Sequence, residues 1–250
     1  MTARQEFDYI IVGAGSAGCV LAARLSQDAR ISVALVEAGE RDEAPEIAIP
    51  IAFPQLFKTK YDWDFVTEPE QALGERRIYL PRGRTLGGSS AINAMIYVRG
   101  NQADFDGWAS EGAPGWSYRE MLPYFIRSEG NERGDPKYHG HSGPLSVQDS
   151  RSMHPLVDHL IEAAVSAGYR PNSDFNGAEQ LGVGSFQLTQ RNGFRCSAAS
   201  AYLNPSLDRP NLRVFTETLV LRLLFEGHRA IGVSVHRDGE EVARVSGSSV

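Results

Sequence analysis

Three glycines near the N-terminus have the spacing of a phosphate-binding turn. Gly13, Gly15 and Gly18 form a G-x-G-x-x-G sequence between a β-rich apolar run, residues 9–12, and a helix-compatible run, residues 19–25. The first glycine permits a tight turn, the second lets a pyrophosphate approach the backbone, and the third lets the helix pack closely on the strand. Unpaired N–H groups at the start of the helix attract phosphate. Ordinary strand-to-helix turns also use glycines, so the flanking residues decide.

An acidic residue follows at the distance that a dinucleotide site requires. A second β-rich run, residues 31–36, ends in Glu37, and an acid about 20 residues past the glycines accepts hydrogen bonds from ribose hydroxyls. Strand, glycine turn, helix, strand and acid occur in register and predict a βαβ dinucleotide unit. The acid argues against the phosphorylated ribose of NADP, but it does not separate NAD from FAD.

A second glycine turn lies further along the chain. Arg82 and Arg84 precede Gly87-Gly88 and Ser89-Ser90, and a helix-compatible run, residues 91–98, follows. The glycines let a ligand approach the backbone, the serines can cap a helix, and the arginines can pair with phosphate. A solvated loop before a capped helix explains the same residues, and on these residues alone both interpretations stay open.

Two histidines in a polar loop raise the question of a metal site. His139 and His141 lie in the segment 129–146, with Asp135 nearby. A fourth ligand is missing and the neighbours are glycine, serine and proline, so a surface loop is the better prediction. His154 and His159 belong to an amphipathic helix predicted over 152–168 and are read as structural.

The remaining pattern predicts a mixture of helices and strands. We expect irregular structure or short helical turns over 46–61 and a small-residue helix over 195–203. Residues 104–128 are read as helical pieces broken at Gly107, Gly112, Pro114-Gly115 and Pro123. The predicted strands are 63–65, 76–80, 212–215, 219–225, 230–237 and 242–245, with turns at Glu226-Gly227 and Asp238-Gly239.

Bulk composition limits the class of protein. The 250 residues carry a net charge of −6, which provides no basic footprint for nucleic acid. No apolar run reaches the length of a membrane span. The first strand follows the N-terminus at once, so no signal peptide is expected, and the two cysteines, Cys19 and Cys196, are too few for a disulfide framework. A reducing cytoplasm is the simplest compartment.

Several segments together resemble the glucose-methanol-choline (GMC) oxidoreductases, flavoenzymes that oxidise alcohols with FAD. The resemblance rests on FDYIIVGAGSAGCVLAARLS, VALVEAG, PRGRTLGGSSAINAMIYVRG, FDGWASEGAPGWSYREMLPYFIRSE and FRCSAASAYLNP with NLRVFTETLVLRLLFEG. It implies an α/β fold: a Rossmann-like FAD-binding βαβ domain with a smaller α+β portion of a substrate domain. The implied division is an FAD-binding domain over 1–150, the start of the substrate domain over 151–210, and strands returning to the FAD domain over 211–250.

The resemblance also implies which residues hold FAD. The pyrophosphate would lie on the first glycine turn, the adenosine ribose on Glu37, and the adenine against the backbone of Val220. Asn93, Ala94 and Met95 would lie against the isoalloxazine. Family members with covalently attached FAD use a histidine where this chain has Ile92, so no covalent attachment is expected there. The full implied set is Gly13, Gly15, Ser16, Ala17, Gly18, Glu37, Ala38, Arg84, Leu86, Gly87, Gly88, Asn93, Ala94, Met95 and Val220.

The implied reaction is hydride transfer from an alcohol carbon to flavin N5, with oxygen, a quinone or a carrier as acceptor. The chain corresponds to about the first half of the family's usual length. The catalytic histidine and its partner belong to the second half, so we expect this part to be inactive alone and a sheet edge to be unpaired where it ends. A flavin-binding module without turnover, a family lyase with structural FAD and, more weakly, a nicotinamide dehydrogenase remain alternatives.

Overall fold

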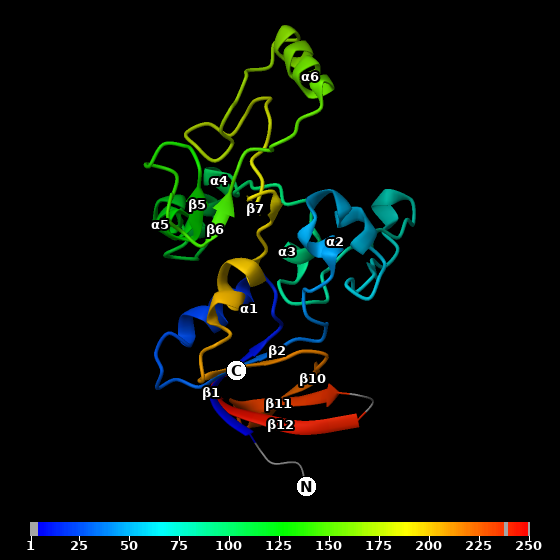
Figure 1. Ribbon diagram of the computed structural model, residues 1–250, viewed down its shortest axis with the longest axis vertical. Coiled ribbons are helices and arrows are strands. Elements are labelled where there is room, and N and C mark those ends of the chain that lie inside the picture. Colours follow the sequence, from blue (N-terminus) through cyan, green and yellow to red (C-terminus); the bar gives the residue numbers. More distant parts are fainter. Residues whose placement is uncertain (1–4, 238–239, 250) are drawn as a thin grey trace. The chain divides into compact units, whose positions relative to one another are not determined.

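The computed structural model describes residues 5–237 and 240–249 (Figure 1). The chain forms two compact units. Unit 1 comprises the residues up to Ala94 together with those from Ser197 onward, and unit 2 comprises Met95–Cys196. The domain division implied by the resemblance is a functional one and stays a prediction; the compact units cut the chain at other positions.

Unit 1 is built on one six-stranded sheet. Its order is β10-β11-β12-β1-β2-β9, with parallel pairing from β12 to β9 and antiparallel pairing among β10, β11 and β12. The bounds of these strands are β1 Gln5–Val12, β2 Val33–Val36, β9 Leu212–Phe215, β10 Leu219–Glu226, β11 Arg229–Arg237 and β12 Glu240–Ser249. The predicted α/β class and C-terminal strands are therefore confirmed, including the turn at Glu226-Gly227; the predicted turn at Asp238-Gly239 lies outside the described residues.

The position of the last strand corrects one expectation. β12 pairs with β11 on one side and with β1 on the other, so it lies inside the sheet. The edge strands are β10 and β9. The expectation of an unpaired edge at the final strand is wrong because β12 inserts beside β1 and does not extend the sheet outward.

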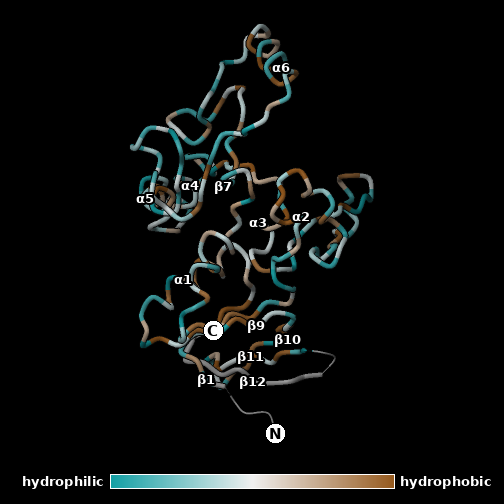
Figure 2. The backbone as a smooth tube through the Cα atoms, viewed as in Figure 1, coloured by the Kyte–Doolittle hydropathy of each residue, from teal (hydrophilic) through white to brown (hydrophobic). Residues whose placement is uncertain are grey.

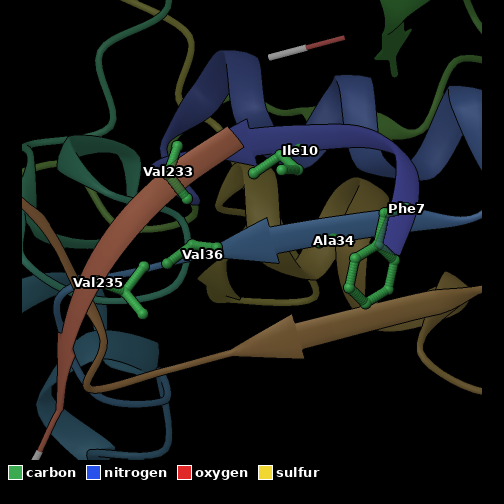
Figure 3. Packing of buried hydrophobic residues seen from close by; sticks show 6 residues of the cluster. All are labelled: Phe7, Ile10, Ala34, Val36, Val233 and Val235. Atoms are coloured by element: carbon green, nitrogen blue, oxygen red, sulfur yellow. The ribbon is translucent and has the colours of Figure 1, made fainter. Parts of the chain in front are cut away.

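Apolar side chains of the sheet form the core of unit 1. All four residues of β2 are buried, as expected for a parallel strand covered on both faces. Figure 2 shows this strand region in brown, in keeping with its apolar sequence. A cluster joins the parallel strands to β11, as Figure 3 shows for Phe7, Ile10, Ala34, Val36, Val233 and Val235.

Helix α1, Ser16–Leu25, packs on the sheet through small residues. Gly18, Cys19, Ala22 and Ala23 are its buried positions, and it contacts β1, β2 and the π-helical turn η3, Ala199–Leu203. Short side chains allow this close approach of helix to strand. A 3-10 turn, η4, Asn204–Ser206, follows η3.

The connection between β2 and the second glycine turn consists of short elements, and over 46–61 it forms short helical turns, as predicted. Its elements are α2 Pro45–Ala48, η1 Pro50–Leu56, β3 Phe65–Val66, η2 Gln71–Leu73 and β4 Tyr79–Leu80. The helix after the glycines, α3, covers only Ser89–Ile92. The run to Val98 is not helical: Asn93 is extended and Met95 has a φ of +62°.

Unit 2 contains longer helices than the sequence predicted. Its elements are α4 Gln102–Ser110, α5 Tyr118–Ser128, β5 Glu129–Asn131, β6 Leu145–Val147, α6 Pro155–Ser166, β7 Gln190–Arg191 and β8 Phe194–Arg195. The predicted breaks at Gly107 and Pro123 are wrong, because α4 and α5 continue through them. Capping boxes at Asn101 and Ser117 fix both helix starts. No helix in the described ranges has the length and apolar character needed to cross a bilayer.

The polar segment 129–146, which contains His139 and His141, takes part in a buried network of hydrogen bonds and ion pairs. The His139 side chain is fully buried, with Nδ1 3.1 Å from Glu129 Oε1 and Nε2 2.9 Å from Asp174 Oδ2. Arg99 Nη2 lies 2.7 Å from the other oxygen of Glu129. The surface-loop interpretation is therefore wrong for His139, since its side chain is buried against the carboxylates of Glu129, in the same segment, and Asp174, from a distant one. Within residues 5–237 no cluster of metal-ligating side chains is found.

Candidate cofactor site

The first glycine turn has the geometry that its sequence predicts. Gly13 leaves β1 with a φ of +88°, and its amide donates to the carbonyl of Val36 over 2.7 Å. A Cβ on Gly18 would lie 1.9 Å from the carbonyl oxygen of Gly13, so only glycine permits this contact between α1 and the turn. Gly15 is the N-cap residue of α1, and a Cβ on Gly15 would meet nothing within 4 Å.

Glu37 ties the end of β2 to the glycine turn. Its Oε2 accepts from the amide of Ala14 over 2.7 Å, and its Oε1 accepts from the amide of Gly39 over 2.8 Å. Burial raises the pKa of Glu37, and these two hydrogen bonds together with the charge of Arg84 only partly oppose that effect. Each carboxylate oxygen keeps a lone pair for another donor, such as a ribose hydroxyl.

The second glycine turn lies directly on the first. The amide of Gly87 donates to the carbonyl of Ala14 over 2.8 Å. A Cβ on Gly88, whose φ is +53°, would lie 2.7 Å from the Cα of Gly15. Side chains at these positions would push the two turns apart, so the paired glycines create a narrow backbone cradle that a phosphate can approach.

A cavity of about 550 Å³ opens beside this cradle at the carboxyl ends of β1 and β2. This is the edge at which parallel sheets bind ligands. Of the predicted residues, seven line it: Gly13, Gly15, Ser16, Glu37, Ala38, Gly88 and Val220. Ala17, Gly18, Arg84, Leu86 and Gly87 do not line it. Gly18, Leu86 and Gly87 are buried behind the turns and position them.

Arg84 has an unused donor close to this site. Its guanidinium lies over the Trp63 ring, 5.0 Å from the ring centroid, and its buried Nε has no hydrogen-bond partner in the described part of the chain. A buried guanidinium donor without an acceptor is costly unless an anionic group satisfies it. The glycine cradle and this arginine together fit a group with a pyrophosphate.

The predicted isoalloxazine residues divide between the two units. Asn93 and Ala94 end the first segment of unit 1, where the Asn93 amide caps α3 by donating to the carbonyl of Ser89. Met95 begins unit 2, where its carbonyl accepts from the amide of Thr189 over 2.8 Å. Their contact with a flavin ring stays a prediction.

Sequence reasoning missed one wall of the cavity. Trp63, Phe65, Thr218 and Leu219 line it. The alternation of Trp63 and Phe65 with two aspartates indicated only a short strand. The position of Thr218 follows from the sheet, since its amide donates to the carbonyl of Glu37.

Residues 7–249 match the GMC oxidoreductase family, and the chain belongs to that family. It is 47% identical over 230 residues to an alcohol dehydrogenase [acceptor] of Pseudomonas putida, covering 91% of this chain and 42% of that protein. It is 45% identical over 245 residues to the mitochondrial choline dehydrogenase of Homo sapiens, covering 95% of this chain and 41% of that protein.

The fold is also found among solved structures. An FAD-dependent oxidoreductase from Chaetomium thermophilum superimposes with a TM-score of 0.90 at 32% identity, covering 97% of this chain and 44% of that one. The chain thus spans about two fifths of the length of the curated relatives that it matches. Family and fold indicate FAD as the cofactor, as the sequence predicted.

Proposed function

We propose that this chain is the cofactor-binding part of an FAD-dependent oxidoreductase that acts on the CH–OH group of a small alcohol. The observation that carries the proposal is the contact between the two glycine turns beside Glu37, which forms a backbone cradle at the carboxyl edge of the sheet. The names of the relatives suggest choline or another alcohol as substrate. FAD, when bound, would supply the hydride acceptor.

The residues of this chain would then hold and orient the cofactor. The glycine cradle and Arg84 would bind the pyrophosphate, and Glu37 would bind the ribose. We assign Asn93, Ala94 and Met95 to the isoalloxazine and Val220 to the adenine. Oxygen, a quinone or a carrier would accept the electrons. Two buried cysteines without a disulfide support the cytoplasm as the compartment.

A second candidate function is FAD binding without turnover. Among the described residues that line the cavity there is no histidine. Glu37 is the carboxylate of this lining, and both of its oxygens already accept backbone amides. The described lining of this cavity therefore offers no base without a backbone hydrogen bond to take the proton of an alcohol, and the chain alone would bind FAD and leave alcohols unoxidised.

Anaerobic addition of choline and a simple primary alcohol to the FAD-loaded chain tests these alternatives. We expect the visible flavin absorbance to stay unchanged for the chain alone. In a chimera, this chain is joined to the part of the Pseudomonas putida relative that the match does not cover. An alcohol should bleach the flavin absorbance of that chimera. A chimera that retains FAD but is never bleached would favour the non-catalytic function, and a chain that retains no FAD would contradict both.

A further inference from the structure

We propose that the buried His139 is a positioning residue for the flavin part of the cofactor. It acts through Asp174 and Asn176, which hold the backbone segment 95–99 of unit 2. The inference rests on the proposed function, because the assignment of Met95 to the isoalloxazine is taken from there. It adds a residue that belongs neither to the glycine turns nor to the described lining of the cavity beside them.

The segment 95–99 begins with a strained residue. Met95 is buried and has a φ of +62°, a left-handed conformation that residues other than glycine adopt only where their surroundings impose it. The amide of Thr189 donates to the carbonyl of Met95 over 2.8 Å and holds this residue on one side. The position of Met95 therefore also depends on how firmly the residues that follow it are fixed.

The side chain of Asn176 holds the residues that follow. Its Oδ1 accepts from the amide of Arg99 over 2.7 Å, and its Nδ2 donates to the carbonyl of Tyr97 over 2.9 Å. Asn176 is buried and comes from a loop that is distant in sequence. Because one amide group grips the backbone at two points, the orientation of Asn176 sets the course of this segment.

Asp174 connects Asn176 to the buried histidine. Asp174 Oδ1 accepts from the amide of Asn176 over 3.0 Å, and Asp174 Oδ2 lies 2.9 Å from His139 Nε2. A single carboxylate therefore bonds to the ring on one side and to the turn that carries Asn176 on the other. His139 thus reaches the segment 95–99 through an unbroken series of hydrogen bonds.

The series of contacts closes on itself through Glu129. His139 Nδ1 lies 3.1 Å from Glu129 Oε1, and Glu129 Oε2 accepts from Arg99 Nη2 over 2.7 Å. Arg99 is consequently held twice, at its amide by Asn176 and at its guanidinium by Glu129. Such a closed ring of buried contacts has little freedom to shift, so it can impose the strained start of the segment.

His139 joins the two carboxylates because both of its ring nitrogens donate. Ionised carboxylates only accept hydrogen bonds, so a ring between Glu129 and Asp174 carries its second proton. In agreement, the hydrogen bond with Glu129 raises the pKa of His139. A neutral side chain at position 139 could not complete both contacts in the same way.

Calorimetric titration of the protein with FAD and with ADP tests the inference. ADP carries adenine, ribose and pyrophosphate but no flavin, so lost positioning of the flavin must weaken FAD binding and leave ADP binding unchanged. We expect Asp174→Asn and Asn176→Ala each to raise the FAD dissociation constant by about tenfold, the effect of a lost buried hydrogen bond. The visible circular dichroism of bound FAD, which reports the surroundings of the isoalloxazine, should change in both variants.

Val147→Ala is the matched control. Val147 is fully buried in β6 of unit 2, and its apolar side chain makes no hydrogen bond to the network, so the variant loosens the packing of unit 2 alone. It should keep both dissociation constants and the flavin dichroism of the wild type. Far-ultraviolet circular dichroism verifies that each variant is folded.

A double variant tests whether His139 and Asp174 act in one series. His139→Gln combined with Asp174→Asn should bind FAD no more weakly than the weaker-binding single variant, because either change already breaks the same connection. Additive losses would separate His139 from the segment 95–99. Asp174, whose side chain is 27% exposed, remains a usable site of change even if His139→Gln is less folded.

Three further results bear on the inference. Folded Asp174→Asn and Asn176→Ala proteins with wild-type FAD affinity and flavin dichroism would overturn it. Equal losses of FAD and ADP affinity, or the same loss in Val147→Ala, would assign these residues a general structural role and overturn it as well. A wild-type protein that binds neither ligand would instead contradict the proposed function itself.

Discussion

The amide of Gly87 donates a hydrogen bond to the carbonyl of Ala14 over 2.8 Å and joins two glycine turns that are distant in sequence. One turn ends β1, and the other precedes α3. Their backbones are so close that no side chain fits between Gly88 and Gly15. The cofactor site therefore depends on two segments that must fold onto each other.

Gly88→Ala should abolish FAD retention. The added Cβ would lie 2.7 Å from the Cα of Gly15, and the φ of +53° disfavours alanine as well. Flavin absorbance after desalting measures the effect. Gly107→Ala is the matched control, because a Cβ there meets nothing within 4 Å. Equal flavin retention in Gly88→Ala and the wild type would contradict the cradle.

Glu37→Gln should destabilise the protein by about 1–3 kcal/mol, because the amide nitrogen would face a backbone donor that now has no acceptor. Urea unfolding measures the loss, and the exposed Glu111→Gln serves as control.

The pKa of Glu37 is raised from its ordinary 4.5 by burial. The folded state therefore binds the Glu37 proton more tightly than the unfolded state does, so protonation of Glu37 stabilises the fold. This stabilisation is complete below pH 4.5 and is lost as pH rises through the raised pKa of Glu37. This decrease of the unfolding free energy with rising pH should be absent in Glu37→Gln. A variant that keeps the wild-type slope would assign the pH dependence to another group.

The buried network of unit 2 should give a stability maximum between pH 4.5 and 6.5. Burial alone would raise the pKa of Glu129, but hydrogen bonds from His139, Asn131 and the Gly140 amide, together with the charge of Arg99, hold the pKa below 4.5. The same contact with Glu129 raises the pKa of His139 above 6.5, against burial. Stability is therefore lost as pH falls through the folded-state pKa of Glu129. It is also lost as pH rises through the folded-state pKa of His139.

His139→Gln tests this network. We expect a loss of about 3 kcal/mol near pH 6, since a buried charge loses its partner, and a flatter dependence above pH 6.5. Urea unfolding across pH 4–9 measures both effects, with the exposed His159→Gln as control. An unchanged alkaline slope in His139→Gln would contradict the assignment.

Both cysteines should resist thiol reagents in the folded protein. Burial raises the pKa of Cys19 to about 12, and its Sγ lies 3.2 Å from the carbonyl of Ala14. Cys196 is also buried. Reaction with a chromogenic disulfide at pH 8 should be absent in the folded state and should reach both thiols in urea. Fast reaction of Cys19 in the native protein would show that α1 opens away from the glycine turn.

The sequence predicted those parts of the site that depend on local backbone chemistry. Gly13 and Gly18 are required by a tight turn and a close helix, so their spacing, together with the flanking strands and Glu37, identifies the βαβ unit. Glu37 is placed by the end of its strand. The resemblance assigned residues of both glycine turns to FAD, but the direct contact of the two turns could not be predicted, because it depends on tertiary packing.

The aromatic wall and the buried histidine had no comparable local signal. Trp63 lines the cavity, and the neighbouring Asp62 accepts amides from separate loop positions, a pattern without periodicity in the sequence. His139 is buried against Glu129, at the start of the same segment, and Asp174, from a distant one, while its immediate neighbours are the small polar residues typical of a surface loop. Only the fold brings these groups together.

The visible absorption spectrum of the protein after mixing with FAD and desalting tests the central claim most directly. The contact of the two glycine turns predicts a retained flavin spectrum in the wild type and its loss in Gly88→Ala. A wild-type protein that is folded by circular dichroism but colourless after desalting would contradict the account.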